Sequence, residues 1–250
     1  MSVADRSAGE KAKQGGIWET IKVVVEALLI ALIFRTLLFH PFNIPSGSME
    51  PTLLIGDYLF VSKFAYGYSR YSFPIDLSFI EGRIWEGTPT RGDIAVFRPP
   101  REPGTDYIKR VIGLPGDRIQ MRDGVLYIND EAVEREPAGE WREDQPLGPV
   151  AQYRETLPNG VSYITLDTRV SDGDDTRVFE VPPDHYFLMG DNRDNSLDSR
   201  FLEAGPVGFV PAENLIGRAE IIFFSVNEAP AWAFWKWPWT VRYDRILDSL

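Results

Sequence analysis

The sequence predicts a mainly β protein, in which one N-terminal transmembrane helix precedes an all-β domain with a β-rich inserted lobe. Three observations predict this fold class. An apolar stretch runs from Ile21 to Phe39. After Pro45 the chain breaks into short runs of β-branched and aromatic residues, which favour strands. No long stretch after residue 40 shows the 3.6-residue period of an amphipathic helix.

Composition narrows the class of protein. The 250 residues are 44% hydrophobic, which is enough for a sizeable core in one large or two small domains. The net charge of −11 argues against a nucleic-acid partner, because phosphate binding needs a basic surface. It also argues against adhesion to anionic lipid by charge alone. The chain has no cysteine, which excludes disulfides and thiolate metal sites.

Residues 21–39 form the predicted transmembrane anchor. As a helix they would span about 28 Å, close to the ~30 Å hydrocarbon core of a bilayer. Lys22 and Glu26 are four residues apart and can pair, and Arg35 can extend its charge to the far interface. The alternative is a cleaved signal peptide, but its apolar core would be only about 7–15 residues long and would end at a small-residue site.

The tail before this stretch, residues 1–20, carries Arg6, Lys11 and Lys13. Positive charge beside a membrane span favours the cytoplasmic side. We therefore expect a single-pass protein of the bacterial cytoplasmic (inner) membrane, with a cytoplasmic N-terminus and its β-domain on the periplasmic or extracytoplasmic side.

The β-domain is predicted over residues 40–117 and 182–225, with the inserted lobe over 118–181. The expected strands are Tyr58–Phe64, Ile94–Phe97, Tyr107–Ile112, Ile119–Met121, Val125–Ile128, Val161–Leu166, Tyr186–Met189 and Ile216–Ser225. Asp123-Gly124 is a strong signal for a hairpin turn. The lobe also holds a Pro- and Glu-rich patch, Glu134–Pro149. Residues 64–79 and the C-terminal tail, residues 226–250, are rich in aromatic rings, which suit membrane interfaces and ordinary cores equally.

A short turn rich in hydroxyl groups, Ser46-Gly47-Ser48, follows the apolar stretch. A serine attacks an amide poorly unless a base removes its proton. A triad with His40 or His185, the chain's two histidines, stays open as an alternative, although neither lies in a recognisable motif. Lysine can be the base when burial lowers its pKa towards neutrality. Lys109, inside an apolar run, is the best-placed lysine, although a strand lysine with its amine in water would show the same pattern.

The segment Gly190–Arg200 is too polar for a core strand. One interpretation is a calcium loop, but an EF-hand needs glycine at its sixth position and glutamate at its twelfth. Counted from Asp191, those positions hold Ser196 and Leu202, so this interpretation fails. The second interpretation, a solvated acidic turn, stays open from the residues alone.

Taken together, these motifs resemble bacterial type I signal peptidase, the membrane-bound leader peptidase with a serine–lysine dyad. The matching segments are Pro45–Leu53, Gly56–Tyr58, Arg91–Phe97, Asp106–Asp117 and Gly190–Arg200, in the family's order. Two features depart from the best-known members: the chain shows one span where some members have two, and its β-lobe has no cysteine pair. Neither departure touches the matching segments.

The resemblance implies a role for each site residue. Ser48 would be the nucleophile, Lys109 the general base, and Ser196 the group that orients Lys109. The Ser48 backbone N–H and the Ser46 hydroxyl would form the oxyanion hole. The supporting ionic residues would be Asp191, Arg110, Asp198 and Arg200. Shallow pockets for small substrate side chains would be lined by Phe42, Ile44, Met49, Leu53, Val96, Tyr107 and Ile108.

The implied function is removal of signal peptides from exported preproteins by a membrane-anchored serine endopeptidase, without a cofactor or metal. The implied partners are preproteins and the lipid bilayer, and the resemblance leaves room for transient contact with the secretion machinery. Two alternatives were weighed. A self-cleaving serine–lysine repressor would need a DNA-binding domain, which residues 1–40 do not offer. An inactive scaffold that binds exported chains would be suggested by loss of Ser48 or Lys109, and both are present.

Overall fold

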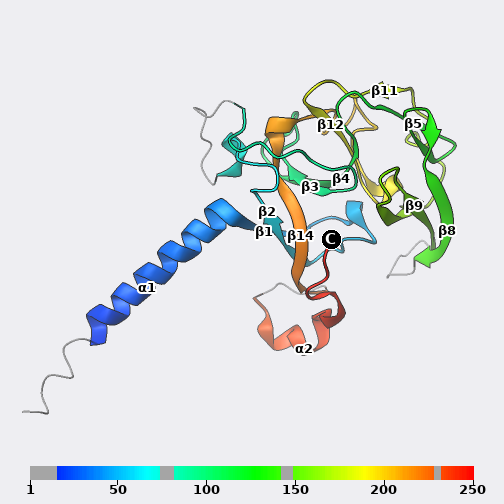
Figure 1. Cartoon of the computed structure of the whole chain (residues 1–250). Helices are drawn as coiled ribbons and strands as arrows, with labels where there is room; N and C mark the ends of the chain where they lie inside the picture. Colours follow the sequence, from blue (N-terminus) through cyan, green and yellow to red (C-terminus); the bar gives the residue numbers. More distant parts are fainter. Residues whose placement is uncertain (1–15, 74–81, 142–148, 228–231) are drawn as a thin grey trace, which may run out of the picture.

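A seven-stranded antiparallel sheet forms the centre of the computed structural model, which describes residues 16–73, 82–141, 149–227 and 232–250. In spatial order its strands are β1 (Phe39–Asn43), β2 (Asp57–Ser62), β14 (Leu215–Ser225), β3 (Ile94–Phe97), β4 (Tyr107–Gly113), β12 (His185–Met189) and β13 (Val210–Pro211). Most of the predicted strands of the main domain therefore form one sheet, and the mainly β class is confirmed (Figure 1).

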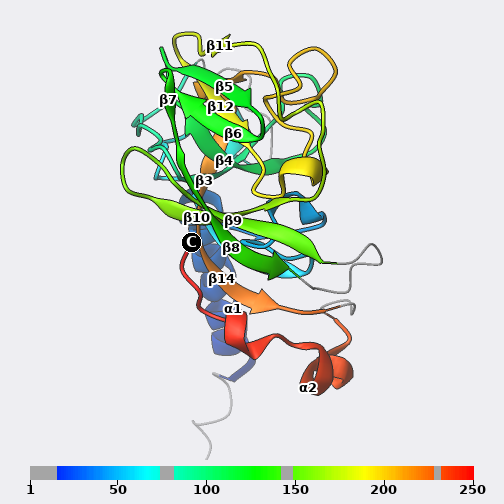
Figure 2. The ribbon, with the colours of Figure 1, turned by 90° about the vertical axis from the view of Figure 1, so that its right-hand side faces the viewer.

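Two smaller sheets come from the chain between β4 and β12. One contains β10 (Ser162–Asp167), β9 (Val150–Thr156) and β8 (Glu134–Trp141). The other contains β11 (Phe179–Glu180), β5 (Arg118–Arg122), β6 (Val125–Ile128) and β7 (Glu131–Ala132). Figure 2 shows them on the side of the large sheet away from α1. They lie in the segment where the sequence predicts an inserted lobe.

The predicted hairpin joins β5 and β6. Asp123 and Gly124 have φ angles of 47° and 73°, and Arg122 pairs with Val125 across the turn. Two successive positive φ values match the right-handed twist of the flanking strands, which is why Asp-Gly favours this turn.

The first helix, α1 (Gly16–Ile33), continues as a short π-helical segment, η1 (Phe34–Leu38). The limits predicted for the anchor are therefore wrong: the helix begins at Gly16, and Phe39 already pairs with Ser62 in the sheet. The predicted pair of Lys22 and Glu26 is present, with Nζ and Oε1 3.8 Å apart. Within the described chain, no helix combines the length and the apolar character needed to cross a membrane.

The remaining helical segments are short. They are α2 (Trp237–Thr240) and the 3₁₀ turns η2 (Gly47–Met49), η3 (Arg70–Ser72), η4 (Arg193–Asn195), η5 (Ala212–Asn214), η6 (Phe234–Lys236) and η7 (Tyr243–Arg245). The described C-terminal residues lie along β14, where the Leu250 N–H donates to the Glu220 carbonyl. Arg242 and Arg245 both pair with the buried carboxylate of Asp57, which fixes this segment to the start of β2.

The buried apolar residues form separate clusters. One cluster, with Leu59, Val61 and Val96, lies beneath β1, β2 and β14. A second, with Ile112, Ile119 and Phe187, joins β4 and β12 to the smaller four-stranded sheet. Since apolar burial is the main stabilising term in folding, this second cluster holds the large sheet and the residues 118–181 together.

Candidate active site

Ser48 lies in η2, the turn between β1 and β2. Its side chain is buried, and the turn is held by the loop after β12, because the Asn192 N–H donates to the Ser48 carbonyl at 3.2 Å and Asn192 Nδ2 donates to the Gly47 carbonyl at 3.0 Å. Gly47 does not adopt a positive φ. A side chain is excluded there instead by Glu50, whose carboxyl atoms lie 2.7 Å from the position a Cβ would take.

Lys109 meets Ser48 across the sheet. It lies on β4, opposite Ala95 of β3, and its side chain is only 4% exposed. Its Nζ is 2.6 Å from Ser48 Oγ and also donates to the Ile108 carbonyl at 3.0 Å. The alternative of a strand lysine with its amine in water is therefore wrong.

The environment of Lys109 favours its neutral form. Burial lowers the pKa of the Lys109 amine to about 8, although the carboxylates of Asp198 and Asp191 oppose this shift and Arg200 adds to it. Burial disfavours the charged form of an amine because solvation is lost. A lysine with this pKa is partly neutral near pH 8, as a general base requires.

Ser196 follows η4 and is buried beside the dyad, lining the same cleft. The predicted hydrogen bond between Ser196 and Lys109 is not formed: Lys109 Nζ donates to Ile108, and Ser196 Oγ has no hydrogen-bond partner among the described residues, although Ser196 is close enough to the Asp198 carboxylate to help lower its pKa. The position is tightly packed, because a Cβ on Gly190 would lie 2.3 Å from Ser196 Oγ and 2.5 Å from the Ser48 carbonyl oxygen. Only glycine allows these two segments to approach so closely.

Ser46 precedes η2 in extended backbone, with φ −139° and ψ 152°. Its side chain is exposed and lines the cleft two residues from Ser48. The structure therefore places the predicted oxyanion donor at the rim of the cleft.

The four predicted ionic residues are buried and form two pairs. Arg110 donates to both carboxylate oxygens of Asp191, at 2.8 and 2.7 Å, and Asp191 also accepts the Thr52 hydroxyl at 2.6 Å. Arg200 pairs with Asp198, whose Oδ2 accepts the Gly190 N–H at 2.9 Å. Burial raises the pKa of Asp198, but the Arg200 guanidinium and these hydrogen bonds outweigh it, so the pKa lies below its usual value. These pairs fix the loop after β12, and the solvated-turn interpretation of residues 190–200 is wrong.

A third buried ion pair was not predicted. Arg193 of η4 pairs with Glu155 of β9, and Glu155 also accepts the Tyr163 hydroxyl at 2.8 Å. The Arg110 guanidinium packs over the Tyr163 ring, 4.2 Å from its centroid. The β9–β10 hairpin thus supports the segment that carries Ser196. No local pattern marks Glu155 or Tyr163, because their partners are distant in sequence.

The dyad opens into a cleft of about 850 Å³. Of the seven predicted pocket residues, Phe42, Tyr107 and Ile108 line it. The prediction is wrong for Ile44, Met49, Leu53 and Val96, which are fully buried in the core beneath β1 and β2. The opposite wall, which was not predicted, consists of residues 169–172 and 193–197. The predicted alternative bases, His40 and His185, do not line this cleft.

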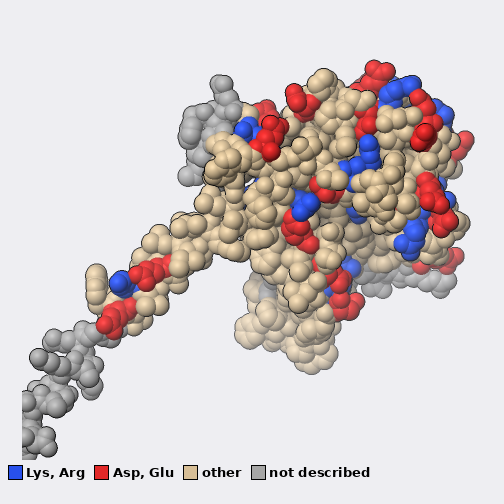
Figure 3. All heavy atoms as spheres, in the orientation of Figure 1, with Lys and Arg blue, Asp and Glu red and all other residues tan. Residues whose placement is uncertain are grey.

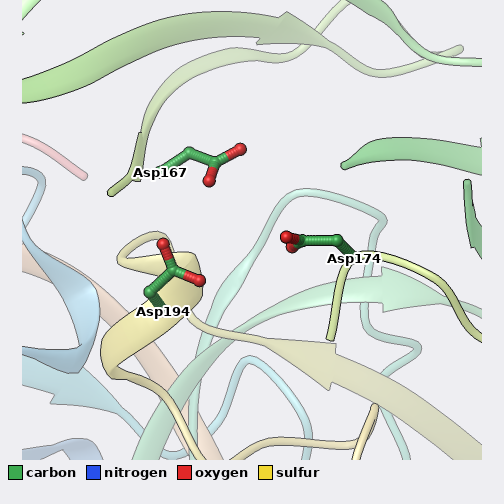
Figure 4. A group of neighbouring side chains, drawn as sticks. All are labelled: Asp167, Asp174 and Asp194. Atoms are coloured by element: carbon green, nitrogen blue, oxygen red, sulfur yellow. The ribbon is translucent and has the colours of Figure 1, made fainter. Parts of the chain in front are cut away.

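A group of three carboxylates includes one residue of that wall, Asp194. Ligand atoms of Asp167, Asp174 and Asp194 lie within 4.8 Å of one another, and Figure 4 shows the three side chains converging. Within the described ranges this group has the geometry to hold a metal ion. Several of its oxygens already have partners: Asp167 pairs with Arg135, and Asp194 Oδ2 accepts the Thr168 N–H at 2.6 Å. Asp194 Oδ1 has no hydrogen-bond partner in the part of the chain that the structure describes. The group fits a structural corner that orders the wall.

Comparison with known proteins identifies the class. The family model described as signal peptidase, peptidase S26, matches residues 17–224, and the chain belongs to this family. The signal peptidase I of Rickettsia conorii is 45% identical over 213 residues, covering 80% of this chain and 77% of the relative. That of Rickettsia canadensis is 44% identical over 223 residues, covering 84% and 80%. A solved signal peptidase I from Enterococcus faecalis is 30% identical, covering 52% of this chain and 96% of that one, with a TM-score of 0.32.

Family membership confirms the resemblance seen in the motifs. The chain is a peptidase that removes signal peptides, and its substrates are preproteins that carry them. The two alternatives, a self-cleaving repressor and an inactive scaffold, are therefore wrong.

Proposed function

We propose that Ser48 and neutral Lys109 cleave the signal peptide through an acyl-enzyme. The observation that carries this proposal is the 2.6 Å contact between Lys109 Nζ and Ser48 Oγ, both buried at the foot of the cleft. When Nζ is neutral, its lone pair accepts the Ser48 proton across this contact. The Ser48 oxygen then attacks the scissile carbonyl carbon.

The proposed steps use groups already in place. The developing oxyanion is stabilised by the Ser48 N–H and by the Ser46 hydroxyl at the rim. Lys109 then delivers its proton to the departing amine, so the C–N bond breaks and the signal peptide stays esterified to Ser48. In the second half Lys109 takes a proton from water, hydroxide attacks the ester, and Ser48 Oγ recovers its proton.

Ser196 is proposed to orient Lys109 in this cycle. Its hydroxyl is buried at the cleft and has no partner, which is costly unless a partner arrives during the reaction. A turn of the Lys109 amine away from the Ile108 carbonyl would supply one. Ser196 then aims the Lys109 lone pair at Ser48 Oγ, and Arg110, Asp191, Asp198 and Arg200 hold the surrounding loop.

The dyad is tested by incubating a preprotein with the wild type and with Ser48→Ala. Cleavage should be abolished because no other group replaces the attacking oxygen, while the fold is kept. Ser162→Ala is the matched control, since Ser162 is exposed and its hydroxyl bonds only to Thr156. Turnover by Ser48→Ala at the rate of Ser162→Ala would overturn the assignment.

We further propose that α1 anchors the chain in a lipid bilayer, with the N-terminus cytoplasmic and the β-domain on the other side. Most apolar side chains of α1 are exposed, among them Leu28, Ile30 and Leu32, and the helix projects away from the sheets (Figure 1). The charged residues of α1 are Glu19, Lys22 and Glu26, and Figure 3 shows the charged side chains on the part of the helix that lies away from the β-domain. Exposed apolar surface of this extent indicates a membrane or protein partner.

The C-terminal segment supports the same orientation. Trp232, Phe234, Trp235 and Trp239 are all more than half exposed. Both ribbon views place this segment on the same lower side of the β-domain as α1. Tryptophan prefers the interface between lipid and water. The anchor is tested by flotation with lipid vesicles: Leu28→Asp should reduce flotation, whereas Val170→Asp, at an even more exposed apolar residue beside the cleft, should not. Equal flotation of both variants would contradict it.

A further inference from the structure

The root of α1 is bound to the β-domain by two side chains that the catalytic chemistry does not use. The last carbonyls of a helix have no partner within the helix. Here the Thr36 carbonyl accepts Lys63 Nζ at 3.2 Å, and the Leu37 carbonyl accepts the Tyr68 hydroxyl. The next carbonyl, that of Leu38, accepts the Lys63 backbone N–H at 3.0 Å. Three successive carbonyls of η1 are thus satisfied by residues of the β-domain.

Lys63 bridges two elements. Its side chain is 3% exposed, and Nζ also donates to the Ser72 carbonyl of η3 at 2.5 Å. Burial, with a smaller effect of the Arg35 charge, lowers the pKa of Lys63 to about 8. Burying the Lys63 amine costs free energy because the charged form loses its solvation, and the hydrogen bonds to the carbonyls offset part of that cost. Its position joins η1 to η3 directly.

Aromatic rings hold the same root by packing. The Phe39 ring lies between three others, with centroid distances of 5.5 Å to Phe34, 6.0 Å to Phe60 and 5.6 Å to Phe64. Phe39 is also the first residue of β1, which runs on to the turn that carries Ser48. The orientation of α1 is therefore transmitted to Ser48 through one paired strand.

We propose that Lys63 and Tyr68 are positioning residues that fix the angle at which α1 leaves the β-domain, and so the height and orientation of Ser48 relative to the bilayer. This inference rests on the proposed anchoring of α1. A rigid exit keeps the cleft at the level where a membrane-inserted preprotein presents its cut site, which raises the effective concentration of site and substrate. A peptide in solution gains nothing from this orientation.

The test compares two substrates with the full-length chain in lipid vesicles. Lys63→Met and Tyr68→Phe should lower kcat/KM for a vesicle-inserted preprotein about tenfold, by loss of effective concentration. For a short soluble peptide, kcat/KM should stay within about twofold of wild type, because the dyad is untouched. Lys63→Arg, which keeps donors for both carbonyls, should restore most of the loss. Tyr127→Phe is the matched control, because it removes a tyrosine hydroxyl on β6, away from the root.

A second measurement follows the angle itself. The chain has no cysteine, so single spin labels can be placed at Leu28→Cys in α1 and Glu131→Cys in β7. The distance distribution between them should be narrow in the wild-type background and broad with Tyr68→Phe. Tyr68→Phe removes one oxygen and keeps the ring, so it tests the inference even if Lys63→Met does not fold.

The outcomes separate the two proposals. If wild-type chain does not float with vesicles, the anchoring of α1 fails. If the wild-type chain floats, the positioning role is overturned by two results together. The first is that Lys63→Met and Tyr68→Phe lower kcat/KM equally for the inserted preprotein and the soluble peptide, or lower it for neither. The second is that the distance distribution between the spin labels stays narrow in Tyr68→Phe.

Discussion

At the residue scale, the proposed reaction depends on a lysine amine, that of Lys109, which the fold keeps out of water. Lys109 has apolar neighbours on β4, and the two carboxylates that act on its amine are each paired with an arginine: Asp191 with Arg110 and Asp198 with Arg200. These carboxylates raise the pKa of the amine, but the loss of solvation on burial is the larger effect and lowers it. The two buried ion pairs therefore order the loop after β12, and the pKa of Lys109 stays low enough for part of the amine to be neutral.

The pH dependence follows from this pKa. The active form is the neutral amine, and its fraction increases as the pH rises through about 8. We expect kcat/KM on a soluble peptide to rise with pH and to level off above that value. Lys109→Arg should be inactive at every pH, because guanidinium stays protonated. A flat pH profile, or activity in the arginine variant, would count against Lys109 as the base.

Ser46 offers a second prediction at this scale. Its side chain lies at the rim of the cleft, and its proposed role is to donate a hydrogen bond to the oxyanion that develops in the transition state. Ser46→Ala should therefore lower kcat by roughly 100- to 1000-fold with KM little changed. Steady-state kinetics on a soluble peptide measure this split. An effect mainly on KM would make Ser46 a substrate-binding residue.

At the scale of elements, the loop after β12 brings Ser196 against the nucleophile turn. Gly190 is the point of closest approach, since a Cβ there would meet Ser196 Oγ at 2.3 Å and the Ser48 carbonyl at 2.5 Å. Gly190→Ala should push the loop and the Ser48 turn apart, lowering kcat by at least tenfold and stability by about 1–3 kcal/mol. Gly104→Ala is the matched control, because nothing lies within 4 Å of its Cβ position. Activity and thermal unfolding of the two variants decide the matter, and an active, stable Gly190→Ala would contradict the packing argument.

The elements also show what sequence can predict. The strands β3, β4 and β12 are short runs with mostly apolar residues that are buried on both faces, and the Asp123-Gly124 turn needs positive φ, so both features can be recognised from local sequence. The strand β8 was not recognised, because its residues are mostly polar and partly or fully exposed, and its pairing with β9 comes from distant sequence. The limit at Phe39 was misplaced because an aromatic strand start continues the apolar pattern of the helix.

The site divides in the same way. Ser48, Lys109 and the ionic pairs were found through motifs whose order matches a family, and the structure brings them together. The pocket residues were predicted only in part, because an apolar side chain near the nucleophile has the same pattern whether it faces the cleft, as Ile108 does, or the core, as Met49 does. Glu155 and Tyr163 could not be predicted, since their role depends on how a separate hairpin packs.

At the scale of the whole molecule, α1 and the catalytic β-domain are physically distinct parts joined at one root. Ser48 follows Phe39 by nine residues, which could extend at most about 32 Å. In the structure part of this link is β1, paired with β2, so the site is held near the root of α1. We therefore expect the β-domain alone to carry out the cleavage, and α1 to provide access to substrates that are inserted in the membrane.

Deletion of residues 1–33 tests this division. The cut removes α1 but keeps β1 and the carbonyls bound by Lys63 and Tyr68, whereas a cut at residue 40 would also remove the first two residues of β1. The truncated chain should cleave a short soluble peptide at nearly the wild-type rate, since the dyad and its ion pairs are intact. On a vesicle-inserted preprotein it should be roughly 10- to 100-fold slower, because the local concentration set by the anchor is lost. The same two substrates with the full-length chain provide the reference.

Equal efficiency on the inserted preprotein would show that α1 is not needed for access, and would assign docking to another surface, first the exposed tryptophans at residues 232–239. Loss of activity on the soluble peptide would show instead that the β-domain depends on α1 for its fold.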